Sequence, residues 1–179
     1  MAKGGVVTSV IRSAPEVLVL GIGNTVMTDD GVGPAVVQAL RREYLFPENV
    51  QIVDGGTLGL DLLPLLEARS HLIMVDAVET GREPGTRVRL SGEELPIALE
   101  TRISPHQMGL KDLLAVARLM GHAPAEMVLI GVQPGCIEIG IELTAEVASQ
   151  VENMKKDVLQ ELQRMGITPA PQWNADANG

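Results

Sequence analysis

The chain has 179 residues, a formal net charge of -9, 45% hydrophobic residues and 21% charged residues. The length fits one domain, and the ordinary balance of apolar and charged residues excludes an intrinsically disordered chain. Aromatic residues make up only 2% of the sequence, so a surface that stacks nucleic-acid bases has almost nothing to stack with. Because the negative charge also repels phosphate backbones and anionic membranes, we expect neither a nucleic acid nor a membrane as a partner.

The cysteine content points to a reducing compartment. Cys136 is the single cysteine, so the chain cannot form an internal disulfide or supply a multi-thiolate metal site. The apolar residues in the first 15 positions are too interrupted for a signal peptide, and no apolar run approaches the roughly 18 residues of a membrane span. We expect a cytoplasmic protein.

Predicted strands and helices alternate along the chain. Short β-branched and aliphatic runs predict strands at residues 17–21, 50–54, 71–77, 86–90 and 127–133. Apolar residues at helical spacing predict helices at residues 34–44, 58–69, 110–120 and 144–165. This order is typical of a single α/β domain with a mostly parallel, twisted sheet of about five strands and helices on both faces. We expect the domain to span residues 16–166, between an N-terminal extension (1–15) and a polar C-terminal tail (167–179).

Acidic side chains and an imidazole follow the predicted strands. In a doubly wound sheet, ligands bind outside the C-terminal ends of the strands, where the strand order reverses. Asp29 and Asp30 follow the first strand, Asp54 ends the second, Asp76 lies near the end of the third, and His106 lies beyond the fourth. An order beginning 2-1-3 makes the first and third strands neighbours. We therefore expect Asp30 and Asp76 to come together.

Each acid also has a structural interpretation. Asp29 and Asp30 precede a helical segment, where an acid commonly caps the helix. Thr28 or Asp29 can serve as that cap, which leaves Asp30 free to project into the crevice. Asp76 closes an apolar strand, so its carboxylate must be paired, hydrogen bonded or metal bound. The alternative is a structural acid that accepts N–H groups from a neighbouring loop.

His106 stands at the start of a predicted helix, where the helix dipole favours the neutral, metal-binding form of imidazole. Together, Asp30, Asp76 and His106 form a suitable ligand set for a divalent ion, although these residue types do not choose the metal. For His71 and His122 we expect surface roles.

Two other chemistries have weaker support. Gly21 and Gly23 suggest a dinucleotide-binding loop, but the third glycine of that motif would fall on Val26. Cys136 with His106 could act as a thiol nucleophile, but a lone cysteine is more often a small buried hydrophobe. A dinucleotide-binding oxidoreductase remains an alternative function.

Six motifs follow one another in order and with consistent spacing between residue 17 and about residue 166. They are Gly21-Ile-Gly-Asn-Thr-Val-Met-Thr-Asp-Asp-Gly-Val-Gly33, Asp54-Gly-Gly-Thr57, Leu72-Ile-Met-Val-Asp-Ala77, Pro84-Gly-Thr86, Ser104-Pro-His-Gln-Met-Gly-Leu110 and Gly131-Val-Gln-Pro134. Together they closely resemble the nickel-iron hydrogenase maturation endopeptidases, and the Ser-Pro-His-Gln form resembles the branch that serves uptake hydrogenases.

The resemblance implies an endopeptidase, grouped with the aspartic-type peptidases, that removes the C-terminal extension of the hydrogenase large-subunit precursor after nickel insertion. The large subunit can then close over its metal centre and assemble. The resemblance also implies that Asp30, Asp76 and His106 contact nickel, which the substrate precursor supplies; Asp30 stands where some members carry Glu. We expect a monomer.

The sequence leaves the chemical step open. Nickel could serve for recognition alone, or it could also polarise the scissile carbonyl or activate water. Alternatively, Asp30, Asp76 or Asp54 acts as the general base. A non-catalytic nickel-binding maturation chaperone with the same ligands is the other alternative function.

Overall fold

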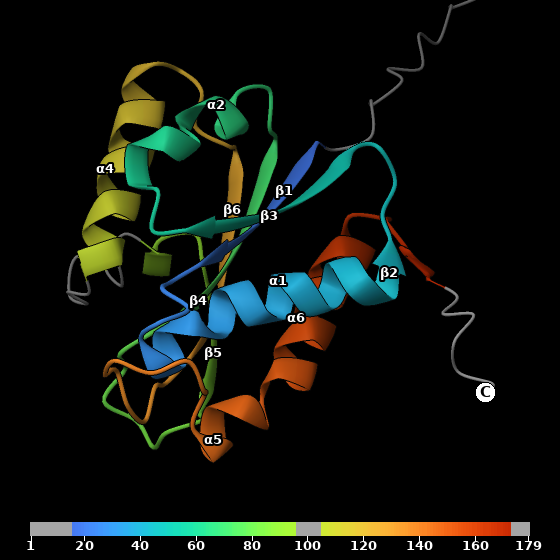
Figure 1. The fold of residues 1–179 in the computed structure, drawn as a ribbon. Helices are drawn as coiled ribbons and strands as arrows, with labels where there is room; N and C mark the ends of the chain where they lie inside the picture. The colour runs from blue at the N-terminus through green and yellow to red at the C-terminus, as the bar shows by residue number, and fades with distance from the viewer. Residues whose placement is uncertain (1–15, 96–104, 173–179) are drawn as a thin grey trace, which may run out of the picture.

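The computed structural model describes residues 16–95 and 105–172, with the side chains of residues 105–109 outside that description. A five-stranded sheet in the order β3-β1-β4-β6-β5 forms its centre (Figure 1). The strands are β1 (Val17–Ile22), β3 (Val50–Gly56), β4 (His71–Ala77), β5 (Arg87–Ser91) and β6 (Glu126–Val132). Within this sheet, the described pairings are parallel except that of β5 with β6. The predicted α/β fold, including the neighbouring first and third predicted strands, is confirmed.

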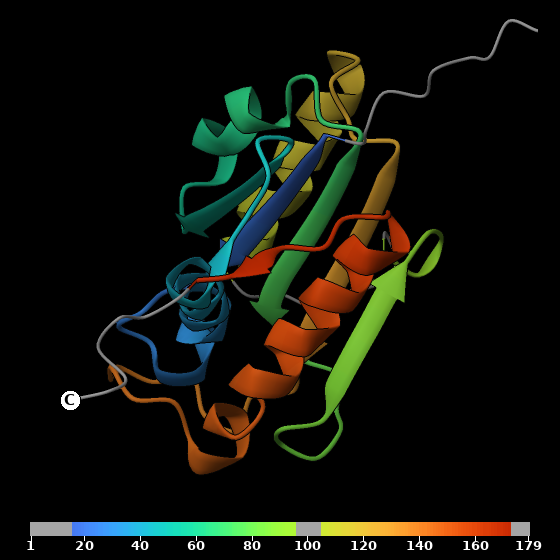
Figure 2. The same ribbon diagram turned by 90° about the vertical axis from the view of Figure 1, so that its right-hand side faces the viewer.

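Helices cover both faces of the sheet (Figures 1 and 2). On one face lie α1 (Val32–Glu43) and α6 (Val151–Arg164), the latter preceded by the short α5 (Ala145–Ala148). On the other face lie α2 (Leu63–Leu66) and α4 (Pro105–Leu119). The 3-10 turns η1 (Thr28–Gly31) and η2 (Gly59–Leu62) lead into α1 and α2.

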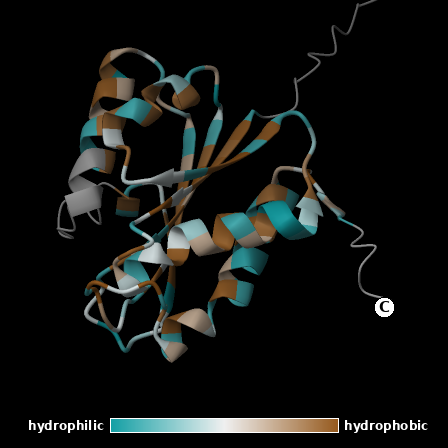
Figure 3. Cartoon of the chain, in the orientation of Figure 1, coloured by the Kyte–Doolittle hydropathy of each residue, from teal (hydrophilic) through white to brown (hydrophobic). Residues whose placement is uncertain are grey.

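The inner strand β1, which lies between β3 and β4, is buried along its whole length and separates two apolar cores. Val17 and Val19 pack with residues of α1 and α6. Leu18, Leu20 and Ile22 pack with residues of α2 and α4 on the opposite face. Since both faces of β1 are covered, its sequence is continuously apolar, and Figure 3 colours this strand largely as hydrophobic.

Two predicted helices are shorter than the apolar spacing indicates. The spacing predicts one helix over residues 58–69, but only η2 and α2 form there. Gly59 has a φ of +52°, which interrupts a right-handed helix. Pro64 cannot donate a backbone hydrogen bond, which suits the first turn of α2. The predicted helix over residues 144–165 likewise divides into α5 and α6.

Residues beyond position 166, the expected end of the domain, contribute to the packed structure. Ile167 is buried in the core on the α1 and α6 face. Further on, β7 (Ala170–Pro171) pairs antiparallel with β2 (Tyr44–Leu45), which follows α1. The packed domain therefore extends through β7 into the predicted tail.

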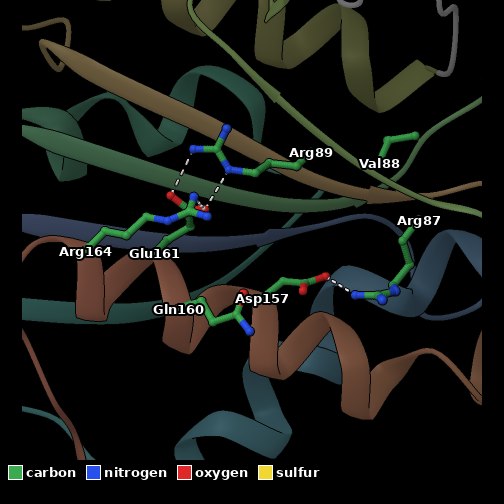
Figure 4. A pocket seen from close by; sticks show the side chains of 7 residues that line it. All are labelled: Arg87, Val88, Arg89, Asp157, Gln160, Glu161 and Arg164. Atoms are coloured by element: carbon green, nitrogen blue, oxygen red, sulfur yellow. Dashed lines mark hydrogen bonds and ion pairs between the residues drawn. The ribbon is translucent and has the colours of Figure 1, made fainter.

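Ion pairs attach α6 to the edge strand β5 (Figure 4). Arg89 donates two hydrogen bonds to the buried carboxylate of Glu161, at 2.6 and 3.0 Å, and Arg164 donates a third at 2.5 Å. Glu161 raises the pKa of Arg89, chiefly through these hydrogen bonds. Arg87 pairs with Asp157 one turn earlier in α6. Each charged side chain that lines the pocket shown in Figure 4 is therefore paired with an opposite charge in the same pocket.

A second ion pair joins α6 to α1. The buried ammonium of Lys155 donates to Glu43 at the end of α1, and to Glu152 at 2.9 Å. The hydrogen bond from Lys155 lowers the pKa of Glu43 against the smaller effect of burial. For Lys155, burial acts to lower the pKa, but the hydrogen bonds to the two carboxylates together raise it. Both charged forms are thus stabilised by folding.

Candidate active site

Three of the expected acids lie at one edge of the sheet, where the parallel strands end. Asp54 and Asp76 lie near the C-terminal ends of β3 and β4, and Asp30 lies in η1, shortly after β1. The strand order places β1 between β3 and β4. In Figure 1, α1 and α4 both begin toward this end of the sheet. The predicted crevice edge therefore carries the predicted acids.

Asp76 is 2% exposed and lies on the α2 and α4 side of the sheet. Met74, two residues earlier in β4, belongs to the core on that side, and alternate residues of a strand point to the same face. The first turn of α4, which packs over this face, contains His106. The side chain of His106 lies outside the described part of the chain. The fold thus brings the backbone position of His106 to the face on which Asp76 lies.

Asp30 is also 2% exposed. Its Oδ2 accepts a hydrogen bond of 2.7 Å from the backbone N–H of Asn24, so the loop after β1 folds back around this carboxylate. Gly23 has a φ of +130°, and a Cβ there would overlap the backbone carbonyl of Asp30. A glycine is therefore required where the loop passes η1.

Gly33, in the first turn of α1, brings η1 against β4. A Cβ on Gly33 would overlap the carbonyl oxygens of Ile22 in β1 and Val75 in β4. Val75 directly precedes Asp76, so the start of α1 lies against the strand ends with no side chain between them. This close approach brings the segment that carries Asp30 to the end of the strand that carries Asp76.

Asp29 has a different role from its neighbour. It is 0% exposed, and its carboxylate accepts four hydrogen bonds from the loop between β6 and α5. The donors are the backbone N–H groups of Gly135 (2.8 Å), Cys136 (3.0 Å) and Thr144 (2.7 Å), and the Thr144 hydroxyl (2.9 Å). These bonds compensate the burial of a charged group. Asp29 therefore fixes two loops together.

The prediction that Thr28 or Asp29 caps the following helix is wrong. Neither η1 nor α1 has a side-chain capping hydrogen bond at its N-cap residue. The hydroxyl of Thr28 instead donates to the carbonyl of Cys136 at 2.7 Å and accepts from the N–H of Glu138 at 3.0 Å. The cap is absent because the side chains of Thr28 and Asp29 bind the loop between β6 and α5, which sequence spacing does not place beside them.

Asp54 lies on the other face of the sheet from Asp76. It stands in register with Gly21, where an added Cβ would meet Val37 of α1. Its Oδ2 accepts from the amide of Gln38 in α1 at 3.1 Å, and its Oδ1 accepts from the N–H of Gly56 at 3.1 Å. The structure gives this carboxylate local structural partners, and it does not group Asp54 with Asp76 on one face.

Gln133 is a buried polar residue that the sequence analysis does not single out. Its Oε1 accepts hydrogen bonds from the backbone N–H and the hydroxyl of Thr80, at 2.6 and 2.8 Å. Its amide donates to Glu79 at 2.9 Å and to the carbonyl of Pro134 at 3.2 Å. Gln133 thereby joins the loop after β4 to the end of β6. Its place as the polar last residue of the apolar run predicted as a strand over 127–133 is the signal that the sequence offers for it.

The loop after β1 is poorly suited to a dinucleotide. A pyrophosphate needs free backbone N–H groups at the start of a helix. Here the carboxylate of Asp30 accepts the N–H of Asn24, and the buried acids Asp29 and Asp30 would repel a phosphate.

Cys136, a half-buried free thiol, contributes backbone groups to the Asp29 and Thr28 contacts.

No group of three His, Cys, Asp or Glu side chains suited to a metal ion occurs among the described residues. Two of the three expected ligands, Asp30 and Asp76, belong to this part of the chain, and the side chain of His106 does not. The ligand set therefore stays a prediction.

A family model described as hydrogenase maturation protease matches residues 34–161. The chain belongs to the hydrogenase maturation protease family. It is 40% identical over 156 residues to the hydrogenase 2 maturation protease of Escherichia coli K12, covering 87% of this chain and 95% of that protein. It is 42% identical over 153 residues to the hydrogenase expression/formation protein HupD of Rhodobacter capsulatus, covering 84% of this chain and 73% of HupD.

Solved structures agree with this family assignment. The structure of the hydrogenase maturating endopeptidase HybD from E. coli superposes with a TM-score of 0.84 at 40% identity, covering 88% of this chain and 98% of that one. A hydrogenase maturation protease from Thermococcus kodakarensis superposes with a TM-score of 0.70 at 29% identity, covering 82% and 98% of the two chains. The expected family and fold are confirmed, and the protein is a protease of this family.

Among residues 16–95 and 105–172, no helix is both long enough and apolar enough to cross a membrane.

Proposed function

We propose that this protease removes the C-terminal extension of the large-subunit precursor of a nickel-iron hydrogenase after nickel insertion. Family membership supports the class of reaction. The main structural support for the site is that Asp30 and Asp76 are both buried and lie on two segments that pack closely together. This close packing is possible because Gly33 has no side chain. The location we propose is the cytoplasm, with the protease acting as a monomer.

In this proposal, Asp30, Asp76 and His106 engage the nickel that is already bound in the precursor. His106 stands four positions before the buried Leu110 in α4, a spacing that puts both positions on one side of the helix. Imidazole suits nickel, and carboxylates can complete its coordination. An empty precursor lacks this contact, so the enzyme spares it. Nickel thus acts as part of the substrate.

The chemical step is the addition of water to the scissile carbonyl, followed by departure of the amine of the released peptide. One group must accept a proton from the water and return a proton to the leaving nitrogen. Asp30 and Asp76 are the candidates for this role, which accords with an aspartic-type grouping. Asp54 is the weaker candidate because Gln38 and Gly56 hold it on the opposite face. The metal can also polarise the carbonyl.

The decisive experiment combines the protein with nickel-loaded precursor and follows the mass of the large subunit by mass spectrometry. We expect loss of a single C-terminal peptide, and no loss when the precursor lacks nickel. Stable binding without any change of mass would contradict the protease proposal and favour the maturation chaperone. Tight binding of a dinucleotide in a titration would instead favour an oxidoreductase.

A further inference from the structure

The loop between β6 and α5 exposes apolar side chains beside the candidate site. Ile139 is 92% exposed and Ile141 is 81% exposed, and Ile137 is exposed as well. We call residues 137–141 the isoleucine loop. Clustered exposure of large aliphatic side chains marks a contact surface more often than a solvated one. The exposed Val26 adjoins it, because Gly140 donates its N–H to the carbonyl of Val26 at 3.0 Å.

The isoleucine loop is held in place by its backbone. Thr28 donates its N–H to the carbonyl of Gly140 at 2.8 Å and accepts the N–H of Glu138 on its hydroxyl. Asp29 binds the loop on both sides of this segment, at Cys136 and Thr144. Since the backbone groups are fixed, the isoleucine side chains need no large rearrangement before contact, which lowers the entropic cost of binding.

An open groove of about 440 Å³ runs beside the loop. This volume falls within the roughly 300–1,000 Å³ of typical ligand pockets. Its lining residues come from the loop after β1, from η1 and α1, and from the end of the β6–α5 loop: Thr25, Val26, Thr28, Gly31, Ala35, Gln38, Ile141 and Leu143. Gly31 directly follows Asp30, and Gln38 in the same wall binds Asp54, so the groove lies on the α1 side of the sheet at the edge where the parallel strands end.

The charge pattern indicates what occupies this surface. Glu138 and Glu142 alternate with the isoleucines, are exposed, and take part in none of the ion pairs found between described residues. A second copy of this acidic chain would bring the same carboxylates against each other across a two-fold axis. A segment with apolar side chains and a Lys or Arg fits better.

We infer that the isoleucine loop and the adjoining groove dock an extended segment of the large-subunit precursor that carries apolar side chains and at least one basic residue. This inference rests on the proposed function and extends it to how the substrate is held. The segment lies along Ile139, Ile141 and Val26, and leads the scissile region toward Asp30.

The test measures steady-state cleavage of nickel-loaded precursor by the wild type, by the double variant Ile139→Ser/Ile141→Ser and by Leu119→Ser. Leu119 is 88% exposed at the far end of α4, so it controls for the loss of an exposed aliphatic side chain. We expect the double variant to lose about tenfold in kcat/KM through a higher KM, with kcat near the wild-type value. The control keeps the wild-type kcat/KM.

A second arm replaces both Glu138 and Glu142 with Gln, which we expect to raise KM and to weaken its dependence on salt. Thermal melting checks that all variants fold. If the wild type cleaves the precursor and the isoleucine variant has an unchanged kcat/KM, the docking inference is overturned and the proposed function stands. An equal loss in Leu119→Ser, or dimerisation that the isoleucine variant abolishes, also overturns the docking inference. A wild type that cleaves nothing overturns the proposed function and this inference together.

Discussion

Thr144 donates two hydrogen bonds to Asp29, one from its backbone N–H to Oδ1 at 2.7 Å and one from its hydroxyl to Oδ2 at 2.9 Å. The two residues are 115 positions apart in the sequence. Asp29 is thereby committed to joining two segments of the chain, and we assign the proposed chemical role to the neighbouring Asp30, which accepts the N–H of Asn24. Of these two consecutive acids, Asp29 therefore has a structural role and Asp30 has the proposed chemical role.

Asp29→Asn should destabilise the fold by about 2–3 kcal/mol, because the amide group cannot accept all the N–H groups that now bind the carboxylate. For a domain of this size, that corresponds to a fall in Tm of roughly 4–12 °C. Glu142→Gln is the matched control, since Glu142 is an exposed acid in the β6–α5 loop to which Asp29 binds. Thermal unfolding monitored by circular dichroism compares the two. Equal melting temperatures would show that the four hydrogen bonds contribute little.

Asp76→Asn and His106→Ala should each reduce processing of nickel-loaded precursor by at least about a hundredfold, because each removes a proposed metal contact. Asp54→Asn should retain turnover within a few-fold of the wild type, since Asp54 is bonded to Gln38 on the opposite face. Mass spectrometry of the large subunit measures all three. Wild-type rates for Asp76→Asn and His106→Ala would refute the metal contacts, and an inactive Asp54→Asn would restore Asp54 as the general base.

Lys155→Met should cost about 1–2 kcal/mol near neutral pH, where it removes the ammonium from Glu43 and keeps most of the apolar stem. The pKa of Glu43 is below its ordinary value of 4.5, so its contribution is present above that pH and is lost as the pH falls through the folded-state pKa. The pKa of Lys155 is above its ordinary 10.5, so its contribution is present below that pH and is lost as the pH rises through the folded-state pKa.

Urea unfolding of the wild type and Lys155→Met across the pH range tests this linkage. The difference in unfolding free energy should be constant between about pH 6 and 9 and should shrink below about pH 4. Lys156→Met is a control on the adjacent, exposed lysine. A difference that does not change with pH would mean that packing, rather than the ion pair, stabilises this contact.

Gly33→Ala should destabilise the protein by about 1–3 kcal/mol, because the added methyl group forces α1 away from the ends of β1 and β4. Gly31→Ala is the matched control at the preceding turn, where the closest atom to an added Cβ is the Cα of Thr25 at 3.2 Å. Chemical unfolding gives both values. A smaller effect at position 33 than at position 31 would contradict the close packing of α1 on the sheet.

The strands and the acids near their ends could be predicted from the sequence because both follow local rules. A strand buried on both faces, such as β4, is continuously apolar, and the fold class places polar residues at its C-terminal end. The antiparallel direction of β5 could not be predicted this way, because strand direction depends on how the connecting segments cross the sheet. Pro64 was a local signal that the helix predicted over 58–69 would be interrupted.

The role of Asp29 could not be predicted, because its partners are distant in the sequence and include backbone N–H groups, which carry no residue signature. Residue type alone therefore favoured the common role of a helix cap. Asp54 shows a related limit. Its position after a strand predicts the correct edge of the sheet, but the face depends on register, which becomes visible only in the paired strands.

The pairing of β7 with β2 determines where the chain can be shortened or extended. Gln172 donates its N–H to the carbonyl of Glu43 at 2.8 Å, directly after β7, and Ile167 fills part of the core. A shortened form ending at residue 166 would open that core and leave the end of α1 and β2 uncovered. For purification or for attaching a fusion partner, an added C-terminal sequence should therefore begin after Gln172, so that the final strand stays paired.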